Sequence, residues 1–191
     1  MAKHLRGTEL VDAALAHKRA GGETLTGAAD LDARSLGDVP LTPALRRWLE
    51  HDDEMFTLGE PMAFGALIAQ EFGDEWADGF AELGALFTAP CVLFDGWGSD
   101  SRRFVYLGAK DEHGEYPVFT VDMDDGLYAC LNGPVDVWLA QQAGYLAEEG
   151  VYGAVPADYE ADRAAHAKLS FDGHVSWENF TFSDEAIAAD E

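Results

Sequence analysis

The fold class is decided by residues 91–131, CVLFDGWGSDSRRFVYLGAKDEHGEYPVFTVDMDDGLYACL. Four short runs rich in β-branched and aromatic residues alternate here with clusters of Gly and Asp, which is the pattern of strands joined by turns. The predicted strands are Cys91–Phe94, Arg103–Leu107, Tyr116–Val121 and Leu127–Leu131. Because so few residues connect them, we expect adjacent antiparallel strands rather than the parallel sheet of a nucleotide-binding fold.

Helical periodicity, with apolar residues three and four positions apart, is found on both sides of this stretch. Before it we expect a short helix with Thr8 as N-cap that ends at Gly21-Gly22, a helix with Thr42 as N-cap and Pro43 in its first turn, and two helices within 61–87 broken near Gly73-Asp74. After it we expect helices over 135–144 and 156–169, a hairpin over 169–177 and an acidic tail. This order, in which a meander of strands follows one group of helices and precedes another, predicts an α+β fold.

The apolar periodicity also suggests how the chain is divided. Residues 21–39 are rich in Gly, Asp, Ala and Thr without sustained periodicity, so we interpret them as a linker. We expect an N-terminal helix and linker over 1–39, an α+β domain over 40–146 that folds as a unit, and a C-terminal extension over 147–191.

The chain is strongly acidic, with 12 Lys and Arg against 36 Asp and Glu among its 191 residues and a formal charge of −24. Such a surface repels phosphate backbones and anionic membranes, so we expect no nucleic acid and no membrane as partner, and a basic protein is favoured. The stretches 48–101 and 111–162 each carry 12 acidic residues and no Lys or Arg. They are either solvated faces or an acidic recognition surface.

No motif indicates a cofactor, a metal site or catalysis. The two cysteines, Cys91 and Cys130, lack metal-ligand spacing, and residues 122–126 fail the calcium-loop pattern because Gly stands where an oxygen ligand is needed. The turn Asp111–Glu115 combines His113 with carboxylates, but we expect it to be exposed to solvent rather than catalytic. We find no secretory signal or apolar run long enough to span a membrane, so a cytoplasmic protein is the expectation.

Five segments carry a family resemblance. They are Leu41–Leu49, Gly98–Gly108, Asp111–Phe119, Val121–Asp125 and Val135–Ala140, and they span roughly residues 40–146. In amino-acid sequence and in order along the chain, these segments resemble bacterial proteins of the SMI1/KNR4 family (SUKH superfamily). The chain departs from the family pattern before Asp136, where an aromatic residue is usual.

The resemblance implies N-terminal helices packed on a twisted, mainly antiparallel sheet, with no cofactor and no enzymatic activity. Many bacterial members are thought to be immunity proteins that neutralise toxins, frequently nucleases, whereas eukaryotic relatives are regulatory scaffolds. Both an immunity protein with a basic toxin as partner and a scaffold with an endogenous partner therefore remain open for this chain.

We predict that the partner binds to acidic loops between the strands. The candidate partner-binding residues are Asp95, Trp97, Asp100, Asp111, Glu112, Glu115, Asp122, Asp124 and Asp125. Alternate turns of a meander lie at opposite ends of the sheet, so the loops at 95–100 and 122–125 are expected together and the loop at 111–115 apart from them. Trp97, between two glycines, is a possible interface anchor or a cap folded over the sheet.

Overall fold

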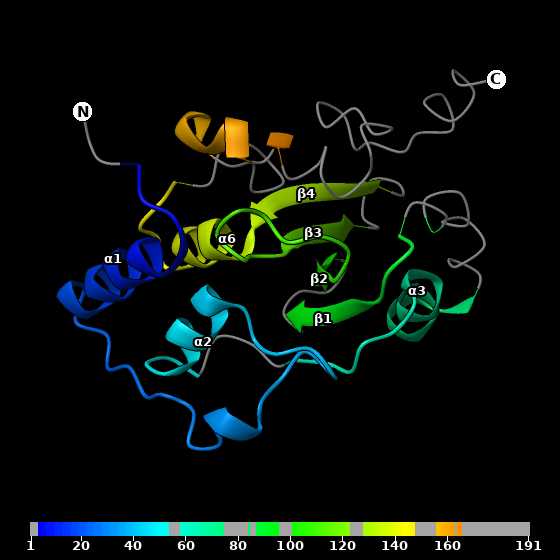
Figure 1. The fold of residues 1–191 in the computed structure, drawn as a ribbon, viewed down its shortest axis with the longest axis horizontal. Coiled ribbons are helices and arrows are strands. Elements are labelled where there is room, and N and C mark those ends of the chain that lie inside the picture. Colours follow the sequence, from blue (N-terminus) through cyan, green and yellow to red (C-terminus); the bar gives the residue numbers. More distant parts are fainter. Residues whose placement is uncertain are drawn as a thin grey trace.

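The sheet is the predicted four-stranded antiparallel meander, in the order β1-β2-β3-β4 (Figure 1). The structure is a computed structural model that describes residues 4–53, 58–74, 84, 87–95, 101–122, 128–147, 156–162 and 164–165. The strands are β1 (Cys91–Asp95), β2 (Ser101–Tyr106), β3 (Pro117–Asp122) and β4 (Tyr128–Pro134). The helices are α1 (Gly7–Ala20), α2 (Pro43–Leu49), α3 (Phe64–Phe72) and α6 (Val135–Gln142), with short 3₁₀ turns η1 (Leu31–Ala33) and η2 (Ala157–Tyr159). The expected α+β class is confirmed.

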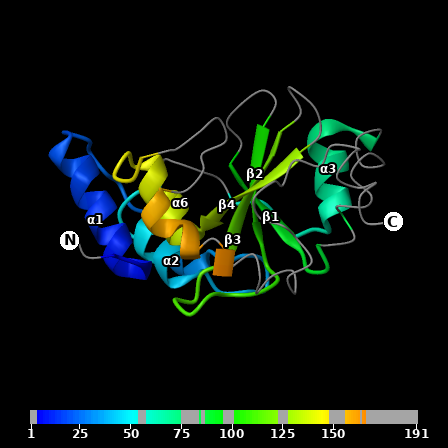
Figure 2. The same ribbon diagram turned by 90° about the horizontal axis from the view of Figure 1, so that it is seen from above.

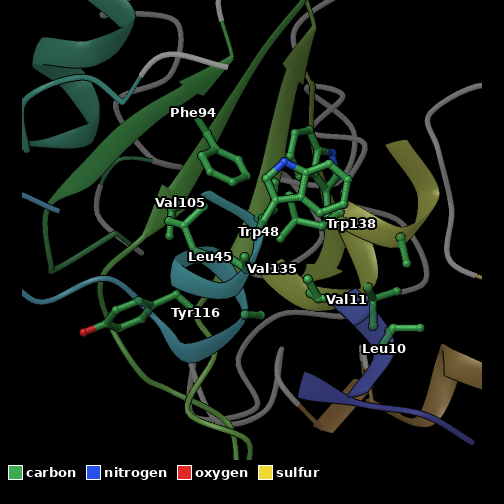
Figure 3. Packing of buried hydrophobic residues seen from close by; sticks show 14 of the residues in the cluster. Leu10, Val11, Leu45, Trp48, Phe94, Val105, Tyr116, Val135 and Trp138 are labelled. Atoms are coloured by element: carbon green, nitrogen blue, oxygen red, sulfur yellow. The ribbon is translucent and has the colours of Figure 1, made fainter. Parts of the chain in front are cut away.

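Helices lie on both sides of the sheet, as Figure 2 shows from above: α1, α2 and α6 gather on one side and α3 lies on the other. Side chains alternate between the faces of a strand, and both faces are buried here. On the first face, Val92, Phe94 and Val105 join the core formed by the helices. Figure 3 shows Trp48 and Trp138 beside Phe94, and the centroids of the Phe94 and Trp138 rings are 4.6 Å apart.

The second face of the sheet carries an aromatic cluster. It consists of Phe104, Tyr106 and Phe119 from the strands with Phe64 of α3 and Phe87. Phe64 and Phe87 stack at 4.5 Å. Helix α3 ends where predicted, at Gly73 with φ of 108°.

Helix α1 is part of the main core. Leu10, Val11, Ala14 and Leu15 are all 0% exposed and pack with residues of α2 and α6. The segment predicted to be a linker is also attached, because Leu36 is fully buried and the Ala28 N–H donates to the Leu49 carbonyl at 2.8 Å. The core therefore extends across residue 40, the domain boundary expected from the sequence.

Two element ends differ from expectation. Helix α1 begins two residues earlier than the Thr8 cap implies, with Arg6 at the N-cap position. Strand β4 continues through Gly133 to Pro134 instead of ending at Leu131, because a register shift between Val118 and Phe119 is accommodated by Gly133 at φ of 111°. The predicted cap of α2 is confirmed, since the Thr42 hydroxyl accepts the Leu45 N–H at 3.3 Å.

The outer edge of β1 is covered by residues 59–62. The Gly59 N–H donates to the Leu93 carbonyl at 2.9 Å, and Met62 and Cys91 exchange backbone hydrogen bonds of 2.9 and 2.7 Å.

Among the described helices, none combines the length and the apolar character needed to cross a membrane. The predicted second helix within 61–87 lies mostly outside the described residues, and the hairpin over 169–177 and the tail lie entirely outside them.

Candidate functional site

The strand ends that carry two of the predicted acidic loops lie together. Asp95 ends β1 opposite Arg103 of β2, and Asp122 ends β3 opposite Ser101, the first residue of β2. The meander therefore places the strand ends next to these two loops at the same end of the sheet. Trp97, Asp100, Asp124 and Asp125 lie outside the described residues, so their contribution to this surface stays a prediction.

The loop between β2 and β3 lies at the opposite end, and its three predicted carboxylates have different environments. Glu112 is 87% exposed, as expected of a surface turn. Asp111 is mostly buried, and its Oδ1 accepts the N–H groups of His113 and Glu115, each at 2.9 Å. Glu115 is 0% exposed, so the expectation that this whole turn is exposed to solvent was wrong.

Glu115 is buried because its carboxyl binds a backbone amide in the first turn of α2. Glu115 Oε1 accepts the Ala44 N–H at 2.8 Å, which is one of the amide groups that a helix leaves without an intrahelical partner. Burial raises the pKa of Glu115 to about 7; hydrogen bonds from Thr42 and Ala44 act against this rise, and the charges of Asp136 and Asp111 add to it. This carboxyl stabilises the fold and is not presented to a partner.

Arg6 is the centre of a buried ion cluster that joins four segments. Its guanidinium donates to Asp136 of α6, at 2.8 Å from Nε to Oδ2 and 3.2 Å from Nη2 to Oδ1, and also to Asp111 and Asp162. Arg6 is 5% exposed and Asp136 0%. Burial alone would lower the pKa of Arg6, but the hydrogen bond to Asp136 and the three negative charges raise it.

Asp136 also serves the start of α1, since its Oδ2 accepts the Gly7 N–H. A carboxylate at this place is favoured by the partial positive charge of a helix N-terminus. Around the cluster, His4 contacts Asp162 at 2.8 Å and the Tyr159 hydroxyl donates to the Leu5 carbonyl at 3.1 Å. The N-terminal segment and residues 157–162 are thereby held against each other.

Two hollows open on the described surface. One, of about 480 Å³, lies beside the Arg6 cluster, and its lining includes His4, Thr8, Glu9, Glu112 and His113. The other, of about 690 Å³, is lined by polar groups that include Asp30, Arg34, Asp38, Asp53 and Glu60. Arg34 is paired with Asp30 and Asp53, so this second hollow keeps a negative balance.

The basic side chains are largely neutralised within the chain. At least six of the nine Lys and Arg residues in the described ranges form ion pairs with its own carboxylates: Arg6, Lys18, Arg34, Arg46, Arg47 and Arg102. The pairs include both buried and exposed contacts. Little positive charge is therefore left on the described surface to compensate the excess of carboxylates.

Nothing in the described ranges forms a metal site, since no three His, Cys, Asp or Glu side chains there are grouped to hold an ion. Cys91 is buried, and burial raises the pKa of its thiol, which keeps the thiol protonated.

Sequence reasoning missed the Arg6 cluster. One signal was present: Asp136 interrupts the apolar run Val135–Ala140, and a carboxylate on a buried helix needs a cation.

Comparison with protein-family models, curated proteins and solved structures finds no match to this chain. The resemblance to SMI1/KNR4 proteins therefore stays a prediction from the sequence, and the function is argued from charge and geometry.

Proposed function

We propose that this chain is a non-enzymatic acidic binding protein, and specifically an immunity protein that neutralises a basic toxin by protein–protein contact. Its target would be a toxin whose positively charged surface ordinarily faces a polyanionic substrate such as nucleic acid. An acidic inhibitor is attracted over long distance to such a surface and occupies it in place of the substrate.

The observation that carries the proposal is that most of the described basic residues form ion pairs within the chain. Because Arg34, Arg46 and Arg47 are already held by carboxylates of the same chain, they do not offset the excess of carboxylates that gives the chain its net charge of −24. An interface of standard size covers only about 800 Å² on each partner, so the acidic groups must be clustered to act together. The end of the sheet at Asp95 and Asp122 is where the sequence clusters them.

The other end of the sheet contributes less. Of its three predicted carboxylates only Glu112 is free of a structural role, because Asp111 binds Arg6 and Glu115 binds the first turn of α2. The proposed partner surface therefore consists of the strand ends at Asp95 and Asp122 together with the sequence-predicted residues Trp97, Asp100, Asp124 and Asp125.

Co-expression tests this proposal. The protein encoded next to this chain's gene, if it ends in a basic domain, is expressed in a bacterial host with and without the chain. We expect growth to stop without the chain and to recover with it. A toxic basic neighbour that the chain neither binds nor neutralises would contradict the proposal, and binding without toxicity would favour a scaffold.

Charge variants locate the surface. Asp100→Asn with Asp124→Asn should slow association with that basic domain and flatten its salt dependence, because rim charges act mainly on the association rate. The matched control is Asp32→Asn with Asp38→Asn, two exposed carboxylates on the segment between α1 and α2, which should leave the rate unchanged. Equal effects of both pairs would place the interface elsewhere.

Trp97→Ala tests the anchor. If Trp97 is buried at the centre of the interface, its removal should speed dissociation and cost about 2 kcal/mol of binding free energy or more. A dissociation rate equal to that of the native chain would assign Trp97 to the fold of its own loop.

A further inference from the structure

Glu115 is a fully buried carboxyl of which only one oxygen is well satisfied. Oε1 accepts the Ala44 N–H at 2.8 Å. Oε2 is buried, and no described group donates a hydrogen bond to it. An ionised carboxylate buried with one oxygen lacking a donor is costly, because that oxygen loses its water without a replacement.

The charges around Glu115 make ionisation still less favourable. Asp111 on its own loop and Asp136 on α6 are the nearby carboxylates, and both already share the guanidinium of Arg6. Asp162 takes part of the same guanidinium and is also bound by His4. On the α2 side, the Thr42 hydroxyl and the Ala44 N–H favour the charged form, but neither carries a full positive charge.

We propose that Glu115 is a proton switch: the folded chain holds a proton on this carboxyl, and release of that proton loosens the 111–115 loop from the first turn of α2. The proton resides on Oε2, since Oε1 is occupied by the Ala44 N–H. Neutralisation removes the repulsion from Asp111 and Asp136 while the contact to α2 is kept. This inference does not rest on the proposed function.

The direction of the pH effect follows from the two states. In the folded chain the pKa of Glu115 is raised to about 7 from an ordinary value of 4.5. The stabilising contribution of the bound proton is therefore complete below pH 4.5 and is lost as the pH rises through about 7. Above that pH the chain must either keep a buried charge or open the loop so that water reaches it.

Opening affects more than one residue. The Asp111 carboxylate accepts the N–H groups of both His113 and Glu115, so the turn is held as a unit by hydrogen bonds at 2.9 Å. Glu112 and His113 line the hollow beside Arg6, and their positions depend on that turn. The protonation state of Glu115 thus sets how rigidly this edge of the surface is presented.

The direct test is a carboxyl ¹³C NMR titration of the full-length native chain, with the Glu115 resonance assigned by its correlation to its own amide. We expect a midpoint near pH 7 for Glu115. A Glu115 midpoint at or near the ordinary value of 4.5 would overturn the proposal, and this outcome needs no variant that folds.

A second test uses Glu115→Gln with Glu112→Gln as the matched control. Between pH 5 and 7, the ratio of the unfolding constants of the native chain and Glu115→Gln should change by up to about tenfold per pH unit, as expected for one proton. Glu112→Gln should show no such change. Amide exchange at Ala44, corrected for the intrinsic effect of pH, should speed up above pH 7 in the native chain but not in Glu115→Gln, and the same profile in both would contradict the switch.

Discussion

Helix α1 is attached to the rest of the molecule by a buried cation at each end, and the two attachments differ in kind. At its start, Arg6 binds three aspartates from three separate segments. In its last turn, Lys18 binds mainly Asp52, with the exposed Glu23 as a second partner, and lies 5.5 Å from the Trp48 ring. The planar guanidinium can serve several carboxylates in fixed directions, whereas the ammonium acts as a compact charge.

The difference shows what each end contributes. The Lys18 end fastens α1 to one neighbouring segment, and a cation there also suits the partial negative charge of a helix C-terminus. At the Arg6 end the cation has a different role, because it allows three acidic segments to come together that would otherwise repel one another. We expect the two ends to respond differently when they are broken.

The largest effect is expected from removing α1 altogether. A fragment of residues 40–146 lacks the four α1 side chains that are 0% exposed, as well as Arg6 and the contacts of residues 157–162. Burying each Leu or Val contributes about 1.5–3 kcal/mol, and the total stability of a domain is only about 5–15 kcal/mol. We therefore expect this fragment to lack a cooperative urea transition, contrary to our expectation from sequence. A transition as sharp as that of the full chain would restore the boundary at residue 40.

The next largest effect is expected from Arg6→Met. It leaves the fully buried Asp136 and the mostly buried Asp111 without their cation, which should cost about 5 kcal/mol, at the upper end for a broken buried pair. Urea denaturation measures the loss, and Arg19→Met on the exposed face of the same helix is the control. Adding Asp136→Asn to Arg6→Met should recover only part of the loss, since Asp111 and Asp162 keep their charges.

Lys18→Met should cost less, about 3 kcal/mol, because a single buried partner, Asp52, loses its cation. Adding Asp52→Asn should restore most of the stability here, in contrast to the Arg6 end. A thermodynamic cycle over the two positions gives this recovery. Equal recovery at both ends of α1 would show that the Arg6 cluster behaves as a set of independent pairs.

The smallest effect is expected from Arg47→Ala, which breaks exposed contacts to Asp12 of α1 and to Glu50. Exposed ion pairs contribute about 0–1 kcal/mol and are screened by salt. We expect a change of about 0.5 kcal/mol or less, which vanishes in 1 M salt. A larger loss that persists at high salt would mean that the Arg47 side chain contributes packing to the contact between α1 and α2.

Much of the fold could be predicted because its signals are local. Thr42 followed by Pro43 marks the start of α2, and the alternation within residues 91–131 marks the strands of the meander. Phe119 and Tyr106, which belong to two of the predicted strands, are buried. These features depend on neighbours within a few positions along the chain, which a sequence displays directly.

What could not be predicted depends on distant partners. The composition around Glu115 is that of an exposed turn, and only the unpaired amides of α2, about seventy positions earlier, explain its burial. Residues 21–39 have the composition of a linker, yet Leu36 is buried because the adjoining segments meet there. The candidate partner surface was predicted from two signals, the acidic charge of the loops and the order of the strands. The strand order places the ends at Asp95 and Asp122 together, but neither signal identifies the partner.

The cover over β1 has a consequence for how the molecule behaves at high concentration. An uncovered edge strand offers free N–H and C=O groups to the edge of another molecule, which starts polymerisation. Residues 59–62 occupy those groups on β1, and the fit leaves little room at Gly59, where an added Cβ would lie 3.1 Å from the Leu93 Cβ. A bulkier residue at position 59 would displace this short segment. The free edge of β1 could then pair with the edge of another molecule and start ordered self-association, while the helical core remains intact.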